Sequence, residues 1–244
     1  MTEQSLLIDQ GNTRLKWVLA RGVELEEDSA GHGSLAAFMQ AFGPENPVRP
    51  DVVLFSSVAD QADVLALSEF CASRWGLKPQ LLESTEQRGA VSSAYSEPGT
   101  LGVDRWLAIV GAVARYGKPV VVWDLGTAST LDAVDSEGQH LGGMIYPGPA
   151  TMLKSLSRDT KLRVPRDSAG ADLSPGESTA DCIRNGVLAA QVGALNQFLR
   201  NLPQEPGDEP LIVVTGGAAS VILPLLDFEH NHDPWLVFRG MLVD

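Results

Sequence analysis

The sequence predicts an α/β protein of two lobes that are related by duplication. A buried apolar strand that runs into an Asp-x-Gly turn occurs twice, once at Asp9 and again at Asp124. Each turn leads through small hydroxyl or amide residues into a second strand. The two aspartates lie nearly half of the 244-residue chain apart, which is too far for a solenoid repeat and fits duplication of a domain-sized unit. We therefore expect one lobe at residues 1–117 and another at 118–244.

The first lobe is expected to alternate strands with helices. Short apolar runs bounded by turn residues predict strands, and apolar residues at a period of 3.6 predict helices. The expected strands are 5–9, 16–20, 23–26, 52–58 and 80–82, and the expected helices are 34–42, 61–75 and 103–116. The long irregular segment 84–101 has no such pattern, and segments of this kind are often functional.

The second lobe repeats the opening pattern and then changes to helices. A hairpin turn at 135–138 leads to a third strand at 139–145. A helix to about residue 156, a polar loop at 157–176 and a long helix capped by Ser178 or Thr179 should follow. The remaining expectations are a strand at 211–214, a helix to about 226, a solvated loop at 230–233 and a last strand at 234–238.

Composition limits the classes of function. Hydrophobic residues make up 44% of the chain, which is enough to bury a core, and the net charge is −13 with no block of basic residues. This charge argues against nucleic acid as a partner. No apolar run approaches the ~20 residues of a membrane span. The N-terminus lacks the pattern of a signal peptide, and the distant Cys71 and Cys182 fit a reducing compartment, so we expect a cytoplasmic protein.

The first Asp-x-Gly turn has two interpretations that the residues alone leave open. Asp9 at a strand end could orient a metal ion or water, and Gly11 would let backbone approach a ligand closely. Asn12, Thr13 and Lys16 could then donate hydrogen bonds and charge to a phosphate. An ordinary hairpin with a polar turn explains the same stretch equally well.

A third glycine turn strengthens the phosphate interpretation. The strand at 211–214 runs into Thr215-Gly216-Gly217 and a helix, and a helix N-terminus favours an anion. Two acidic turns that face each other would suit a metal–nucleotide. A P-loop and the protein-kinase signatures are both absent from the sequence. The three turns in this order indicate two ribonuclease H-like lobes, as in actin, sugar kinases and Hsp70, with ATP between them.

A further candidate site opens the helix at 103–116. A helix N-terminus stabilises a carboxylate, so Asp104 would be able to accept a proton. Arg105 could clamp a carboxylate on a small substrate. A helix start with an acidic first turn and a surface arginine is the simpler interpretation of these two residues in isolation.

Taken together, the motifs resemble those of the type III pantothenate kinases over nearly the whole chain. In order, they are Asp9-x-Gly11-Asn12-Thr13 with Lys16, Gly102-x-Asp104-Arg105, Asp124-x-Gly126-Thr127, Gly142-Gly143 with Pro147-Gly148, Thr179-x-x-x-Ile183-x-x-Gly186, and Thr215-Gly216-Gly217. Tyr95, three residues before Pro98, resembles the family's Tyr-x-x-Pro motif. The family often has asparagine two residues before this tyrosine, where this chain has Ser93. Ser129 replaces a threonine and keeps the hydroxyl group.

The resemblance implies a role for each matching residue. It implies ATP-dependent phosphorylation of pantothenate with Asp104 as the general base. The implied pantothenate contacts are Tyr95, Gly102, Val103, Asp104, Arg105 and Thr179, the last of them across a homodimer interface. The implied ATP contacts are Asp9, Gln10, Gly11, Asn12, Thr13, Arg14, Leu15, Lys16 and Thr127. Mg²⁺ would accompany ATP near Asp9, and Asp124 would bind a monovalent cation, K⁺ or NH₄⁺.

Two other classes of function remain open at this point. Some relatives of these kinases are described as accessory regulators of transcription, so a regulatory protein could keep the nucleotide fold. The intact set of Asp9, Asp104, Arg105 and Asp124 favours catalysis, and the acidic charge argues against direct contact with DNA. An actin-like ATPase without a small-molecule acceptor would leave Asp104 and Arg105 unexplained.

Overall fold

The chain divides into two compact units. The computed structural model describes residues 3–11, 14–59, 61–164, 172–203 and 209–244. One unit is Met1–Gly117 with Trp235–Asp244, and the other is Lys118–Pro234. The predicted second lobe of 118–244 is therefore too long at its C-terminal end. Its last residues form helix α7 (Leu236–Met241), which buries apolar side chains, among them Phe238 and Met241, in the core of the first unit.

The first unit is built on a five-stranded mixed sheet of order β3-β2-β1-β4-β5. Strand β1 is antiparallel to β2 and parallel to β4, β2 is antiparallel to β3, and β4 is parallel to β5. The strands are β1 (Gln4–Gln10), β2 (Leu15–Arg21), β3 (Glu24–Gly33), β4 (Val52–Ser57) and β5 (Gln80–Leu81). Strand β3 extends past the predicted 23–26, because its acidic sequence, in which no residue is buried, pairs along β2 at the edge of the sheet.

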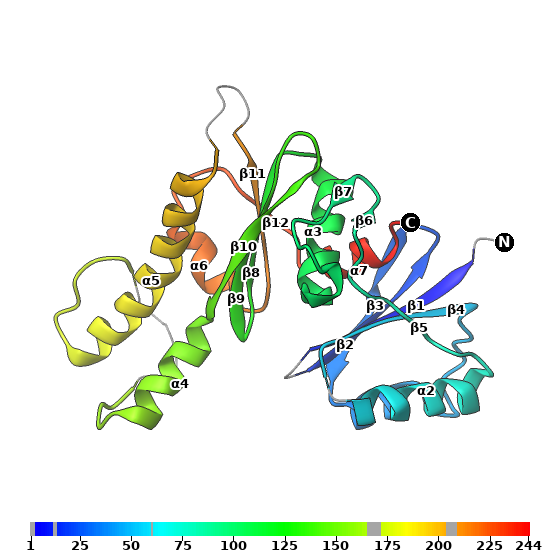
Figure 1. Ribbon diagram of the computed structural model, residues 1–244. Helices are drawn as coiled ribbons and strands as arrows, with labels where there is room; N and C mark the ends of the chain where they lie inside the picture. Colours follow the sequence, from blue (N-terminus) through cyan, green and yellow to red (C-terminus); the bar gives the residue numbers. More distant parts are fainter. Residues whose placement is uncertain (1–2, 12–13, 60, 165–171, 204–208) are drawn as a thin grey trace. The chain divides into compact units, whose positions relative to one another are not determined.

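Helices cover both faces of this sheet (Figure 1). Leu6 and Ile8 of β1 pack with the helices α1 (Leu35–Ala41) and α2 (Gln61–Trp75), whereas Leu7 packs with α3 (Val103–Tyr116) and α7. Alternate side chains of a strand point to opposite faces, so a strand buried on both faces reads as an unbroken apolar run. The unit's short elements are β6 (Gln87–Arg88), β7 (Val91–Ser92) and the 3₁₀ helix η1 (Pro98–Thr100).

The second unit repeats the strand order of the first. Its sheet has the order β10-β9-β8-β11-β12, in which β8 is antiparallel to β9, β9 to β10, and β8 is parallel to β11 and β11 to β12. The strands are β8 (Val120–Leu125), β9 (Ala128–Val134), β10 (His140–Pro147), β11 (Leu211–Thr215) and β12 (Asn231–His232). This repetition of one topology confirms the prediction of two duplicated ribonuclease H-like lobes.

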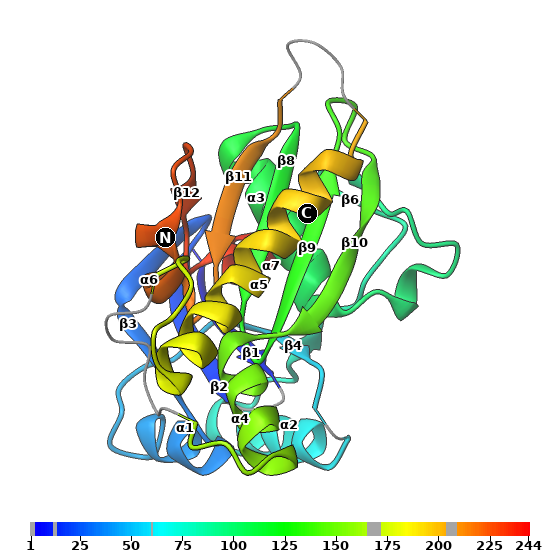
Figure 2. The same cartoon turned by 90° about the vertical axis from the view of Figure 1, so that its left-hand side faces the viewer.

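Helix α5 (Thr179–Asn201) lies across one face of this sheet (Figure 2). Its buried residues, among them Leu188 and Leu195, form a core with Trp123 and Leu131 of the sheet. The other helices are α4 (Pro149–Asp159), α6 (Ala219–Ile222) and the 3₁₀ helix η2 (Leu223–Leu225). Of the helices in the described ranges, none is both long and apolar enough to cross a membrane.

Two predictions near the C-terminus are wrong. The expected strand at 234–238 is the start of helix α7, because a short apolar run does not distinguish a helix from a strand. The expected solvated loop at 230–233 contains β12, and Asp233 is only 3% exposed. The backbone N–H of Asp233 donates to the carbonyl of Val214 at 3.0 Å, which fastens this segment to β11.

Helices α3 and α7 approach each other closely at two glycines. A Cβ atom on Gly111 would lie 2.1 Å from the Leu236 carbonyl oxygen, and one on Gly240 would lie 1.9 Å from the Leu107 carbonyl oxygen. Both contacts are with backbone, so a methyl group at either position must push the helices apart.

We expect Gly111→Ala to lower the free energy of unfolding by about 1–3 kcal/mol, the usual cost of overpacking a core. Urea unfolding of the purified protein measures this change. The control is Gly193→Ala on α5, where the added Cβ has no neighbour within 4 Å and alanine is the better helix former by about 1 kcal/mol. Equal stability of the two variants would contradict the steric argument.

Candidate functional site

Asp9 lies at the end of β1 and is almost buried, with 8% of its surface exposed. Ser56 is its register partner on the parallel strand β4, and the Ser56 hydroxyl donates to Asp9 Oδ1 at 2.8 Å. Burial raises the pKa of Asp9, and repulsion from the Asp104 carboxylate adds to this, while Lys16 and the Ser56 hydroxyl lower it. A buried carboxylate whose charge is costly would be stabilised by a cation, so this position fits a magnesium ion.

The remaining described residues of the first loop differ in what they can offer a ligand. The Gly11 N–H donates to the Arg14 carbonyl at 3.0 Å and closes the turn. Lys16 is exposed and lies opposite Asp9 in the register of β1 with β2. Leu15 is buried in the core, so only its backbone is available.

Gln10 is buried as well, and its Nε2 donates to Asp63 Oδ2 of α2 at 3.1 Å. This bond orients the residue that follows Asp9. Asn12 and Thr13, which the sequence also assigned to this loop, lie outside the described residues.

The start of α3 brings five of the six predicted substrate residues together, counting Tyr95, which contacts Arg105. Gly102 is the N-cap of the helix, and Val103 is buried at its first position. Asp104 is half-buried, and its Oδ1 accepts from the N–H of Arg105 at 2.8 Å. The Arg105 side chain is buried, and its Nη1 donates to the Tyr95 hydroxyl at 3.2 Å. The start of α3 therefore places a carboxylate beside a guanidinium group that is held by a hydrogen bond to Tyr95.

The first unit thus gathers most of its predicted site residues. Asp9 and Asp104 are close enough to interact electrostatically, although one ends a strand and the other begins a helix. Tyr95, from the irregular segment 84–101, contacts Arg105. Two like charges and a buried cation in one region are typical of a functional site rather than of a solvated helix start.

In the second unit, the structure brings the second and third glycine turns side by side. Asp124 and Thr215 are register partners at the ends of the parallel strands β8 and β11. Asp124 is half-buried, and a Cβ on Gly216 would lie 2.4 Å from its Oδ1. Gly216 also has a φ of +91°, which favours glycine. The N–H of Ala218 donates to the Leu125 carbonyl at 3.0 Å and ties the two turns together.

Thr127 is exposed at the turn between β8 and β9. Its carbonyl accepts from the N–H of Gly148 at 3.1 Å and from the Thr151 hydroxyl at 2.6 Å. The backbone of this turn is therefore held by the start of α4, while the Thr127 side chain remains accessible.

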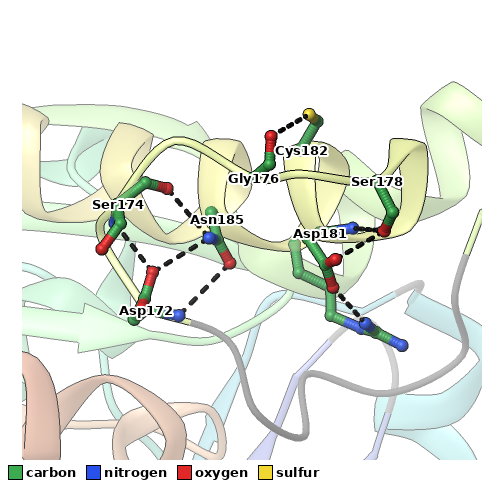
Figure 3. A network of polar contacts seen from close by, with 8 residues as sticks. Asp172, Ser174, Gly176, Ser178, Asp181, Cys182 and Asn185 are labelled. Carbon is green, nitrogen blue, oxygen red and sulfur yellow. Dashed lines mark hydrogen bonds and ion pairs between the residues drawn. The ribbon is translucent and has the colours of Figure 1, made fainter.

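Thr179 is the exposed first residue of α5, and a polar network surrounds the helix start (Figure 3). Ser178 is the N-cap, and its hydroxyl accepts from the Asp181 N–H at 3.2 Å. Asn185 binds the preceding segment: its Nδ2 donates to Asp172 Oδ1 at 2.9 Å, and its Oδ1 accepts from the Asp172 N–H at 3.2 Å. These bonds fold the segment before the helix back along α5.

Sequence reasoning did not find the residues that support the site. Ser56 and Asp63 each hold a residue of the first loop. The signal for Ser56 is a polar residue at the end of the buried strand 52–57, the same position that Asp9 has on β1.

Among the described residues, no group of three or more His, Cys, Asp or Glu side chains could hold a metal by itself. Mg²⁺ that arrives with ATP needs only one or two carboxylates, because phosphates and water complete its shell.

Comparison with solved structures finds the same fold in nucleotide-binding proteins. The activator of 2-hydroxyisocaproyl-CoA dehydratase from Clostridium difficile, solved with ADPNP, is 10% identical with a TM-score of 0.54 and covers 99% of this chain and 92% of its own. MreB 5 of Spiroplasma citri, solved with AMPPNP, is 11% identical with a TM-score of 0.53 and covers 98% and 95%. A Campylobacter jejuni protein described as a Baf family transcriptional activator is 21% identical with a TM-score of 0.64, covering 97% and 94%.

Comparison of sequences identifies the family. The family model described as type III pantothenate kinase matches residues 5–201. A type III pantothenate kinase of Methylibium petroleiphilum is 35% identical and covers 97% of this chain and 96% of its own. The corresponding protein of Alcanivorax borkumensis is 32% identical with the same coverage. The chain therefore belongs to the type III pantothenate kinase family.

Proposed function

We propose that this chain transfers the γ-phosphoryl group of ATP to the primary hydroxyl of pantothenate. The product is 4'-phosphopantothenate, and the reaction is the first step of coenzyme A biosynthesis. Family membership supports this function. The structural observation that carries it is the Asp104–Arg105 pair, which puts a half-buried carboxylate next to an arginine fixed by Tyr95.

Asp104 is the proposed general base. It accepts the proton of the pantothenate hydroxyl as that oxygen bonds to the γ-phosphorus, and ADP leaves with the bridging oxygen. Phosphoryl transfer needs little covalent help from the protein, so positioning and charge stabilisation supply most of the rate.

The proposed pantothenate site consists of Tyr95, Gly102, Val103, Asp104 and Arg105. The Arg105 guanidinium holds the pantothenate carboxylate, because its planar donors match the two oxygens. Val103 contributes through its backbone, since its side chain is buried in the core.

The proposed ATP contacts are the loop from Asp9 to Lys16 and Thr127. Asp9 holds Mg²⁺, which arrives with ATP and offsets charge on the phosphates. Asp124 is the proposed ligand of a monovalent cation, K⁺ or NH₄⁺. The close packing of Gly216 against its carboxylate supports a fixed oxygen ligand at this position.

We also propose a homodimer in the cytoplasm, in which Thr179 reaches the substrate of the partner subunit. Strand β10 is the edge of its sheet and exposes three apolar side chains, those of Leu141, Met144 and Ile145, the last of them 63% exposed. A second copy of the chain would cover such an edge. Light scattering of the purified protein measures the mass that tests the dimer.

ATP consumption with and without pantothenate, at several potassium concentrations, tests the function. Release of ADP that depends on both pantothenate and potassium is the expected result. Hydrolysis of ATP that ignores pantothenate would instead indicate an actin-like ATPase. A complete lack of turnover with Mg²⁺ and K⁺ present would contradict the kinase and favour a regulatory protein.

Arg105→Ala is expected to raise the KM for pantothenate by roughly 10–100-fold, because hydrogen bonds to a charged group contribute about 1.5–3 kcal/mol. The KM for ATP should stay within about twofold, and steady-state kinetics with each substrate varied in turn measures both constants. Tyr95→Phe is the matched variant, since it removes only the hydroxyl that accepts from Arg105 and should have a smaller effect in the same direction. A change in the KM for ATP alone would contradict the carboxylate clamp.

A further inference from the structure

Helix α5 carries a fully buried amide in its apolar stripe. Gln191 has no exposed surface and lies between Leu188 and Leu195, which pack on the sheet. Burying an amide costs free energy unless all of its polar atoms find partners. A leucine would satisfy the packing at this position more simply, so the hydrogen bonds of Gln191 need an explanation.

Those hydrogen bonds join three separate elements. Gln191 Oε1 accepts from the Ser129 hydroxyl at 2.6 Å, at the start of β9. Its Nε2 donates to the Pro147 carbonyl at 2.9 Å, at the end of β10, and lies 3.5 Å from the Met152 sulfur in α4. The orientation of the amide is fixed, because only its nitrogen can donate to a carbonyl.

The same three elements enclose the turn at Gly126 and Thr127. Ala128 and Pro147 are register partners, and Gly148, which follows Pro147, donates to the Thr127 carbonyl. Thr151, which precedes Met152, donates to that carbonyl as well. Gly148 and Thr151 are therefore the two residues that hold the Thr127 carbonyl. Gln191 contacts their chain neighbours, Pro147 and Met152.

We propose that Gln191 is a positioning residue for the nucleotide: it fixes the Gly126–Thr127 turn in the conformation that binds ATP. This inference rests on the proposed contact between Thr127 and ATP. A turn that is already ordered loses less conformational freedom when the ligand binds, so loosening it lowers affinity for the nucleotide. Gln191 itself has no exposed surface, so it acts through the residues that it contacts.

The test compares Gln191→Leu with Val192→Ala. The first variant keeps an apolar stripe but removes the side-chain contacts with Ser129, Pro147 and Met152. The second truncates the neighbouring core side chain, which makes none of these bonds, and controls for lost stability. Calorimetric titration with a non-hydrolysable ATP analogue and Mg²⁺ gives the Kd, and thermal unfolding gives the Tm.

Gln191→Leu should raise the Kd for the analogue and the KM for ATP about tenfold, while the KM for pantothenate stays within about twofold. Val192→Ala should lower the Tm and leave the Kd within about twofold. Equal Kd values for Gln191→Leu and the wild type would overturn the proposal.

If Gln191→Leu does not fold, Thr151→Val serves in its place. It removes the half-buried hydroxyl that donates to Thr127 and should raise the Kd for the analogue about threefold. An unchanged Kd in this variant would overturn the proposal too. The titration contains no pantothenate, so a wild type that binds the analogue but does not phosphorylate pantothenate refutes the proposed function and leaves the role of Gln191 testable.

Discussion

Asp104→Asn is expected to lower kcat by about 10²–10⁴-fold, the range that a positioned general base contributes. The amide keeps the size of the side chain and can still accept from the Arg105 N–H, but it cannot take a proton from the pantothenate hydroxyl. The KM values for both substrates should change little, because the contacts proposed to bind them remain. Steady-state ADP release at saturating pantothenate and ATP measures the loss.

Two controls separate lost chemistry from lost structure. Asp28→Asn makes the same change at an exposed carboxylate of β3 in the same unit and should keep kcat within about twofold. Asp104→Asn should also keep the Tm of the wild type, since the half-buried side chain retains its shape. A variant with normal folding and near-normal kcat would remove Asp104 from the role of base.

The sequence predicted those parts of the site that follow one continuous stretch of chain. Asp9 and Asp124 stand where buried apolar runs end, and the structure places both near the ends of strands. Asp104 and Arg105 were predicted at a helix start, and α3 begins at Val103 as expected. Alone, each motif also fitted a hairpin or a helix cap; their order along the chain identified the family.

The parts that the sequence did not predict depend on distant pairing. Ser56 supports Asp9 only because β4 lies parallel to β1 in one particular register. Gln191 looks like a polar interruption of an amphipathic helix, and nothing local shows that it is buried over a turn more than sixty residues earlier, where Ser129 is its partner. Helix α7 was predicted as a strand because its apolar run is short, and the close packing against Gly111 of α3 involves a residue far away in sequence.

Asp9→Asn is expected to have opposite effects on activity and on the stability of the ligand-free protein. Turnover should fall by about 10²–10³-fold, a usual loss when one group that stabilises transition-state charge is removed. The Tm without ligands should rise near neutral pH, because the variant no longer carries a charge that burial makes costly. Stability and activity conflict at this position, as they often do in active sites.

The pH dependence of the Tm tests the cause. The pKa of Asp9 is higher in the folded than in the unfolded chain, so folding is favoured while the carboxyl is protonated, and this contribution is lost as the pH rises through the folded pKa. The Tm values of variant and wild type should therefore converge near pH 4, the ordinary carboxyl range, and separate as the pH rises. Each kcal/mol by which the variant gains in free energy of unfolding would raise its Tm by about 2–4 °C for a chain of this size. A variant that is less stable than the wild type at neutral pH would show that Lys16 and Ser56 outweigh the cost of burial.

With Mg²⁺ and ATP present, the wild type should have a higher Tm than Asp9→Asn, the reverse of the order without ligands. Ligand at about 100 times its Kd stabilises the folded state by about 2.7 kcal/mol, and the ionised Asp9 carboxylate is the form that can bind the metal. The wild type should gain this stabilisation and the variant should gain much less. Ser56→Ala provides the complementary case: it removes the hydroxyl that favours the charged form, so it should lower the ligand-free Tm yet keep most of the stabilisation by Mg²⁺ and ATP. If Asp9→Asn gained as much from the ligand as the wild type, Asp9 would not hold the metal, and its buried charge would require a different explanation.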